Sequence, residues 1–440
     1  MASELATSFC RVVCRRLPDM LKQRLWGERF LKRLVMLTGA TLIGQLAFSA
    51  SAPLLTRLFT PESFGAFGLF AALTGIAASV ATLRYEFAIP FAADEQEAEQ
   101  LLAVMVVSAT FWALILLPLL WLWADPLAAL FGVPALAAML PWLSLALLLW
   151  GLAAGFNHLA IRHRHYRRVS LSQAGYLLAQ SLAQLLAGVL GAGVTGLVIG
   201  FLCGQIARIT AHYGSHLPRR LLRALRTPAA CWRTALRHRR YAFLTSPAML
   251  LQNTAQYGMV LLVLFLYGPG AGGLFVLAQR MLDAPVRLVG NTASLAYLGE
   301  IAGGGRDDVA HVFRRTARRF ALLGGLGLLP VCFFGPELFA LFFGPAWERS
   351  GEIARMLVPM QLMRFTVIPV SQTVNRYGRQ DLQLRAAGSG LCALLASFAV
   401  GWHWRWPLEA TLLLFSVTLA VIYGLWLQGM ARLVREMAAA

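Results

Sequence analysis

Charged residues are scarce in this 440-residue chain. Only 13% of the residues are charged, whereas 58% are hydrophobic, and the mean hydropathy is +0.63. Soluble domains carry roughly a quarter charged residues, so a soluble globular protein is excluded. The apolar runs are long enough for membrane helices of about 20 residues, and the short alternating segments of a membrane β-barrel are lacking. The composition therefore predicts an all-α polytopic membrane protein.

Catalytic motifs are also missing from the sequence. GxxxxGK[ST], HExxH and GxSxG do not occur, and the predicted outer loops are too short to hold a catalytic domain. The six cysteines form no CxxC set, so no metal site is indicated. We therefore expect neither an enzyme nor an ATP-driven pump, and we expect no bound cofactor.

Acidic residues are few, and the formal net charge is +19. The basic residues are unevenly distributed, because most lie in every second segment between apolar runs. The opposite segments hold only Arg57, Arg349 and Arg405. This asymmetry follows the positive-inside rule and places both termini in the cytoplasm. The charge is therefore explained by membrane topology and anionic lipid headgroups as partners, rather than by nucleic acid.

The apolar runs predict about twelve transmembrane helices. They lie at 34–57, 64–90, 100–123, 136–161, 171–190, 193–212, 242–267, 271–300, 320–343, 350–374, 384–402 and 407–431. Six helices form an N-lobe over 34–213, and six form a C-lobe over 242–434. A basic cytoplasmic segment, 1–33, precedes the first lobe, and a basic cytoplasmic linker, 214–241, joins the two.

Two sequence echoes indicate that the lobes are repeats. LAALFGVP at 127–134 returns as LFALFFGP at 338–345, which is 211 positions later. Leu58, Pro61, Gly65, Phe67 and Leu69 return 208 positions later as Leu266, Pro269, Gly273, Phe275 and Leu277. Since each half has an even number of helices, the repeats are parallel and surround a central cavity.

Charged residues inside apolar spans are the strongest functional candidates, because they are costly in lipid and should face protein or water. Arg280, Asp283 and Arg287 follow i, i+3, i+7 spacing and share a helix face, and Arg364 lies near the middle of its span. One acid cannot neutralise several arginines, so the surplus charge suits an anionic ligand such as a pyrophosphate. The alternative is an ion pair that only holds the helix in place.

Weaker candidates lie on other helices. Asn253 and Gln256 could donate to sugar hydroxyls, although bonds between helices are the commoner use. Arg84 and Glu86 suit substrate entry or gating, unless Arg84 snorkels to the headgroups. The remaining pair, Arg162 and Arg164, either obeys the topology rule or gathers an anionic headgroup near the entry.

Four strings resemble segments of Wzx-type polysaccharide flippases, which belong to the multidrug/oligosaccharidyl-lipid/polysaccharide exporter superfamily. They are LRYEFAIP (83–90), IRHRHYRRVSLSQ (161–173), YAFLTSPAMLLQNTAQ (241–256) and GLFVLAQRMLDAPVRLVGN (273–291). The resemblance implies transfer of undecaprenyl-pyrophosphate-linked oligosaccharide to the periplasmic leaflet of the bacterial inner membrane by alternating access. It further implies a role in O-antigen, capsule or exopolysaccharide synthesis, with other polysaccharide-assembly membrane proteins as partners.

Two rival functions remain. A cation-coupled multidrug antiporter has the same architecture, but an organic cation suits an acidic or aromatic cavity rather than surplus arginine. A membrane glycosyltransferase, polymerase or ligase would need an acid–base pair on an accessible loop, and no such pair is visible. H⁺ or Na⁺ exchange is the expected energy source for transport, with Asp283 and Glu86 as candidate acids.

Overall fold

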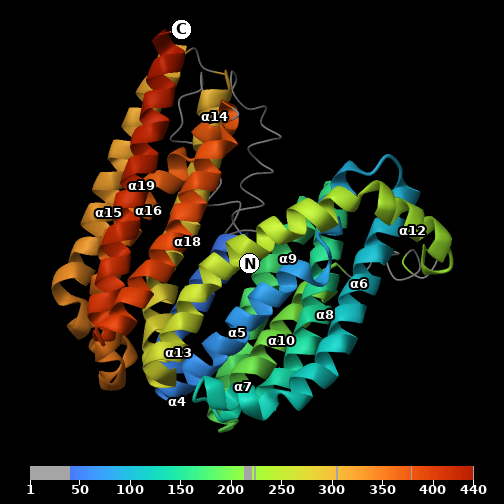
Figure 1. Cartoon of the computed structure of the whole chain (residues 1–440), viewed down its shortest axis with the longest axis horizontal. Coiled ribbons are helices and arrows are strands. Elements are labelled where there is room, and N and C mark those ends of the chain that lie inside the picture. Colours follow the sequence, from blue (N-terminus) through green and yellow to red (C-terminus); the bar gives the residue numbers. More distant parts are fainter. Residues whose placement is uncertain (1–39, 213–220, 222–223, 304–305, 378, 440) are drawn as a thin grey trace. The chain divides into compact units, whose positions relative to one another are not determined.

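The computed structural model describes residues 40–212, 221, 224–303, 306–377 and 379–439. The basic segment 1–33 and parts of the first predicted span and of the linker 214–241 lie outside these residues. Within the described part the chain is helical throughout, as the composition predicts (Figure 1). The contacts divide it into two compact units, the first reaching Gly273 and the second beginning at Leu274. The repeat halves themselves stay a prediction, because contact density does not measure duplication.

The first unit contains the following elements: α4 (Ala52–Leu58), α5 (Pro61–Ala81), η1 (Tyr85–Phe87), η2 (Ile89–Phe91), α6 (Glu95–Leu122), α7 (Ala124–Leu130), α8 (Ala135–Arg162), α9 (Tyr166–Val189), α10 (Gly193–Thr210), α12 (Pro228–Arg237) and η3 (Tyr241–Thr245). Helix α13 (Ser246–Pro285) continues from the first unit into the second. It consists of two helices that meet at Gly268, whose φ of 85° suits glycine. That turn matches the predicted break between the spans 242–267 and 271–300.

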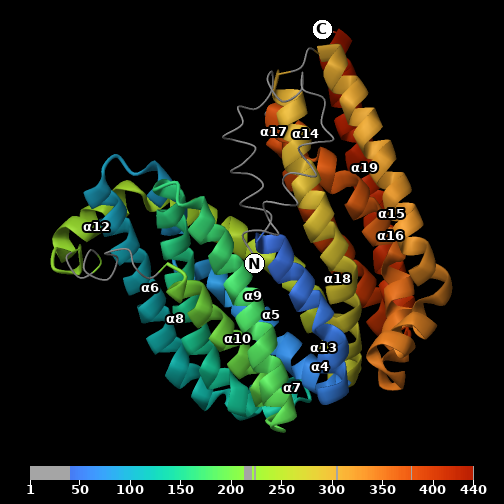
Figure 2. The same cartoon turned by 180° about the vertical axis from the view of Figure 1, so that it is seen from behind.

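The second unit contains η4 (Val286–Gly290), α14 (Asn291–Gly303), α15 (Arg306–Phe343), η5 (Pro345–Trp347), α16 (Glu348–Val370), α17 (Gln372–Arg376), α18 (Gln380–His403) and α19 (Leu408–Ala439). Its core joins Tyr297 and Ile301 of α14 to Phe313 of α15, Val367 of α16 and Met430 of α19. Figures 1 and 2 show α15, α16 and α19 side by side in this unit.

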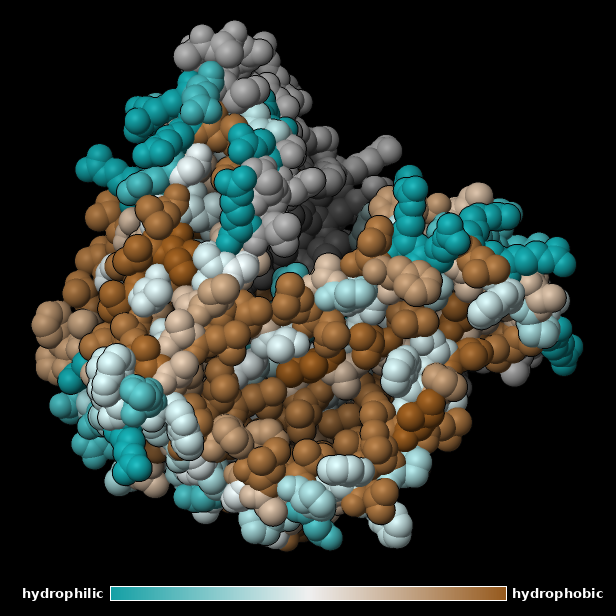
Figure 3. Space-filling view, in the orientation of Figure 1, coloured by the Kyte–Doolittle hydropathy of each residue, from teal (hydrophilic) through white to brown (hydrophobic). Residues whose placement is uncertain are grey.

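Nine helices of the described part are long and apolar enough to cross a membrane. One of them, over 241–290, is long enough for two spans and bends at Gly268. The predicted span 171–190 falls on α9, which is not among the nine because polar residues interrupt it. Two of those polar residues, Gln180 and Gln184, are buried. Figure 3 shows broad apolar surfaces along the helices, as lipid contact requires.

The second predicted span differs from the structure. The sequence predicts a helix over 64–90, but α5 ends at Ala81, and residues 82–92 form turns and the short 3-10 helices η1 and η2. Leu83 and Arg84 have φ values of 49° and 59°, in the left-handed region that side chains rarely adopt. The apolar run therefore continues beyond the helix, and tertiary contacts hold the unwound segment.

The first turns of α5 and of the second half of α13 contact each other reciprocally. A Cβ atom on Gly65 would overlap the carbonyl oxygen of Pro269, and a Cβ atom on Gly273 would overlap that of Pro61. Pro61 and Gly65 correspond to Pro269 and Gly273 in the second sequence echo. Two equivalent turns thus pack with each glycine against the other's proline carbonyl, which requires glycine at both positions.

Candidate functional site

A polar cluster in the first unit surrounds Ser79, near the end of α5. Asn253 of α13 donates from Nδ2 to Ser79 Oγ at 2.7 Å and to the Gly75 carbonyl at 3.3 Å. The Ser79 carbonyl accepts from Ser246 Oγ at 3.2 Å and from Arg84 Nε at 3.0 Å. In the structure Asn253 thus makes the interhelical bonds that the sequence left as its alternative role.

Arg84 and Glu86 form a buried ion pair beside this cluster. Arg84 Nη1 lies 3.2 Å from Glu86 Oε1, and the two side chains are only 5% and 1% exposed. The Arg84 guanidinium also lies 5.6 Å from the centre of the Trp150 ring, a cation–π distance. Arg84 is therefore enclosed by protein and does not snorkel to a surface. The second carboxylate oxygen of Glu86, Oε2, is buried without a hydrogen-bond partner in the described part of the chain.

Arg162, at the end of α8, holds the unwound segment in place. Its guanidinium donates to the carbonyls of Ile89 at 3.2 Å, Ala92 at 2.7 Å and Asp94 at 3.0 Å, and it contacts Glu95 at 3.5 Å. The Ile89 and Asp94 carbonyls also accept from the backbone N–H groups of Ala92 and Ala98, so the arginine adds a side-chain bond to each and ties the segment to α8. Arg162 is thus bound to its own chain, whereas Arg164 and Gln256 are exposed.

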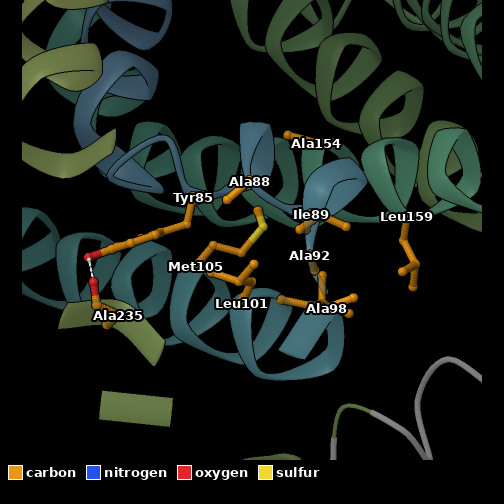
Figure 4. Packing of buried hydrophobic residues seen from close by; sticks show 11 residues of the cluster. Tyr85, Ala88, Ile89, Ala92, Ala98, Leu101, Met105, Ala154, Leu159 and Ala235 are labelled. Carbon is orange, nitrogen blue, oxygen red and sulfur yellow. Dashed lines mark hydrogen bonds between the residues drawn. The ribbon is translucent and has the colours of Figure 1, made fainter. Parts of the chain in front are cut away.

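The unwound segment also packs on the linker helix α12, a contact that the sequence reasoning missed. The Tyr85 hydroxyl donates to the Ala235 carbonyl at 3.1 Å, at the side of a core that includes Ile89 and Met105 (Figure 4). Glu97, near the start of α6, accepts from Arg237 at 2.9 Å and contacts His238 at 3.2 Å. The sequence offers one signal in this region, the capping pattern of Asp94 and Glu97, which predicts that a helix begins there.

The second unit has its own buried polar cluster, on α13 and α16. Asp283 Oδ1 accepts from Arg364 Nη1 at 2.7 Å and from Gln361 Nε2 at 3.0 Å. The Asp283 side chain is 8% exposed and that of Arg364 is 24% exposed. The sequence spacing offered Arg280 or Arg287 as the partner of Asp283. In the structure, Arg364 from a different helix pairs with it and is largely neutralised.

Arg280 lies one turn before Asp283 on α13 and is half-buried, with its Nε atom fully enclosed. The side chain of Arg287 lies outside the described residues. Together with Asp283 and Arg364, Arg280 makes a group of two arginines and one acid on α13 and α16. The formal charge of these three side chains is positive, and their role in binding an anion stays a prediction. In the described residues no group of His, Cys, Asp and Glu could hold a metal ion.

A family model described as polysaccharide biosynthesis protein matches residues 54–352, well over half of the chain. The chain belongs to this family. No curated protein matches the sequence.

Solved structures show the same fold at low sequence identity. The lipid II flippase MurJ in an inward closed conformation matches with a TM-score of 0.71 at 13% identity, over 90% of this chain and 87% of that one. An inward-facing multidrug resistance MATE transporter of the MOP superfamily matches with a TM-score of 0.63 at 12% identity, over 89% and 95%. A MOP superfamily transporter from Pyrococcus furiosus matches at 0.56 and 12% identity, over 92% and 97%. This family member therefore has the MATE/MurJ fold.

Proposed function

We propose that the protein transfers a polyprenyl-pyrophosphate-linked oligosaccharide from the cytoplasmic to the periplasmic leaflet of the bacterial inner membrane. The observation that carries the proposal is the group of Arg280, Asp283 and Arg364, two partly buried arginines and one buried acid on apolar helices of a polysaccharide biosynthesis protein. An arginine in hydrocarbon is costly unless it meets an anion or water. A pyrophosphate headgroup supplies that anion, while the polyprenyl tail stays in lipid.

The proposed mechanism is alternating access between two parallel six-helix repeats around a central cavity, with twelve helices and both termini in the cytoplasm. The reciprocal packing of Gly65 and Gly273 supports it, since equivalent turns that contact each other are typical of a twofold relation. Asn253 and Gln256 are proposed to contact sugar hydroxyls when the Ser79 cluster opens. Arg84, Glu86, Arg162 and Arg164 are proposed to act at the cytoplasmic opening.

Transport is measured as surface glycan in cells that depend on this gene and as flipping of a lipid-linked glycan in proteoliposomes. We expect Arg280→Ala and Arg287→Ala each to reduce transfer at least tenfold while the protein remains folded in the membrane. The loss of one charge-assisted bond, about 1.5–3 kcal/mol, has this size. Arg349→Ala is the matched control, because Arg349 forms an exposed ion pair with Glu409. Normal transfer in both site variants would refute the anion-cavity mechanism.

The rival function is export of organic cations. The shared fold with the MATE transporter supports it, but the arginine bias of the second unit disfavours a cationic substrate. Cells that produce the protein are loaded with a cationic dye, and dye efflux is compared with that of cells lacking it. We expect equal efflux. Strong dye export without any effect on surface glycan would replace the proposed function by drug antiport.

We also propose that a cation gradient drives the cycle through Glu86. Glu86 Oε1 accepts from Arg84, whereas its Oε2 is buried and accepts no hydrogen bond in the described part of the chain, which makes this oxygen the candidate acceptor for a proton or Na⁺. In proteoliposomes with an imposed pH or Na⁺ gradient, Glu86→Gln should abolish the acceleration by the gradient. Retained acceleration in folded Glu86→Gln protein would exclude this residue.

A further inference from the structure

The first turns of α15 carry an arginine face that the proposed transport path does not use. His311, Arg314, Arg315, Arg318 and Arg319 are all exposed. At 100° per residue they fall within an arc of roughly 140° on one side of the helix. None of the four arginines forms an ion pair or hydrogen bond within the described part of the chain. The face is thus a concentrated and uncompensated positive charge.

Packing fixes the direction in which this face points. On the opposite side of α15, Val309 and Phe313 are 0% and 3% exposed and belong to the core of the second unit. The helix therefore cannot turn its arginines inward without exposing that core. Like charges at i, i+4, such as Arg314 and Arg318, repel and destabilise a helix. A bound polyanion would remove this repulsion, whereas a solvated helix face alone retains it.

The position of the face along α15 corresponds to the lipid headgroups. The helix has 38 residues, roughly 57 Å at 1.5 Å per residue, whereas a span needs only about 20 residues. Directly after the arginines, Leu322, Leu323 and Leu326 are 58%, 56% and 66% exposed, as lipid-facing residues are. Figure 3 shows hydrophilic side chains gathered at this end of the second unit, next to apolar helix sides. The arginine face thus lies where hydrocarbon gives way to headgroups.

A hollow of about 500 Å³ lies on the arginine face, lined by its five members and Leu322. The hollow is open to the outside, so it can admit a headgroup without enclosing it. Guanidinium groups bind phosphate oxygens in bidentate fashion. An ordinary phospholipid offers them one phosphate with a single charge, whereas a pyrophosphate diester offers two adjacent phosphates with two charges, so that each phosphate can meet two arginines.

We propose that the arginine face of α15 is a recruitment site, which binds the pyrophosphate of the lipid-linked substrate in the cytoplasmic leaflet before the substrate enters the transport path. The inference rests on the proposed function, because it takes its ligand from there. Leu322 and the leucines that follow it accommodate the first isoprene units, while the sugars extend into the cytoplasm. The site raises the local concentration of substrate, and transfer itself takes place elsewhere.

Binding of a short-chain polyprenyl pyrophosphate to the full-length protein in zwitterionic nanodiscs tests the proposal. Replacing Arg314, Arg315, Arg318 and Arg319 together by Gln should weaken binding at least tenfold, equal to about 1.4 kcal/mol. Replacing them by Lys should cause a smaller loss, because the charge remains but the bidentate geometry does not. The matched control changes four exposed arginines near α12, namely Arg226, Arg233, Arg239 and Arg240, to Gln. Its binding should stay within about twofold of the original, because these arginines do not belong to the arginine face; since its charge change is identical, a loss caused by net charge alone would appear in both variants.

Two results would overturn the recruitment site. One is equal binding by the Gln variant and the unchanged protein. The other is competition by phosphatidylglycerol as strong as by the pyrophosphate lipid, since the face would then bind any anionic headgroup. In transport assays the Gln variant should raise the substrate concentration for half-maximal flipping and leave the maximal rate unchanged. If Arg280→Ala loses transfer while the Gln variant binds normally, the proposed transport function still holds. Only the proposal of a recruitment site would then be wrong.

Discussion

At the residue scale, the buried carboxylates of Asp283 and Glu86 differ in how their arginine partners hold them. Asp283 accepts from two side chains on α16, whereas Glu86 is paired with Arg84, two residues away on an unwound stretch. Burying two charges is expensive, and their attraction repays the cost only while both partners are present. Removing one member of the Arg84–Glu86 pair therefore leaves an uncompensated charge in the first unit.

We predict that Glu86→Gln destabilises the protein by about 3–5 kcal/mol, because Arg84 then remains buried without its counter-charge. The double change Arg84→Gln and Glu86→Gln should cost less than the sum of the two single changes. Thermal unfolding of the purified proteins in detergent measures the loss of stability in the two single variants and in the double variant. Strictly additive effects would show that the pair does not interact energetically, although its atoms lie 3.2 Å apart.

At the element scale, the residues that hold the unwound segment 82–92 give no local signal in the sequence. Leu83 and Arg84 adopt positive φ without being glycine, and Arg162 satisfies carbonyls from about 70 positions away. The breaks at Gly268 and around Gly191 were predictable, because glycine marks their positive φ. The pairing of Asp283 with Arg364 was not, since spacing along one helix cannot reveal a partner on another.

The packing of α5 against the second half of α13 leads to a second prediction. Gly65→Ala and Gly273→Ala should each lower the unfolding temperature and the amount of folded protein in the membrane, because the added methyl group would overlap a proline carbonyl. Gly327→Ala is the matched control, since a Cβ atom there meets no other atom within 4 Å. It should be neutral or stabilising by up to about 1 kcal/mol. Equal behaviour of all three variants would mean that the two turns do not pack as described.

At the scale of the whole molecule, composition alone was sufficient for the all-helical, multi-pass architecture, because lipid leaves few options for an apolar chain. It was less reliable for the number of spans, since the polar residues of α9 face protein rather than lipid. The orientation of the chain in the membrane rests on the arginine distribution. Both the transport direction and the recruitment site depend on that orientation.

Single cysteines in a protein without its native cysteines measure this orientation directly. We predict that a membrane-impermeant maleimide labels Ala346→Cys in intact cells, because the turn after α15 has few basic residues nearby and faces the periplasm. Arg239→Cys, in the linker, and His311→Cys, on the arginine face, should be labelled only after the membrane is permeabilised. All three positions are exposed, so accessibility within the protein does not separate them. Labelling of positions 239 and 311 in intact cells, with position 346 protected, would show that the chain has the opposite orientation in the membrane. The arginine face would then lie in the leaflet where the substrate is released, which would exclude a role in recruitment.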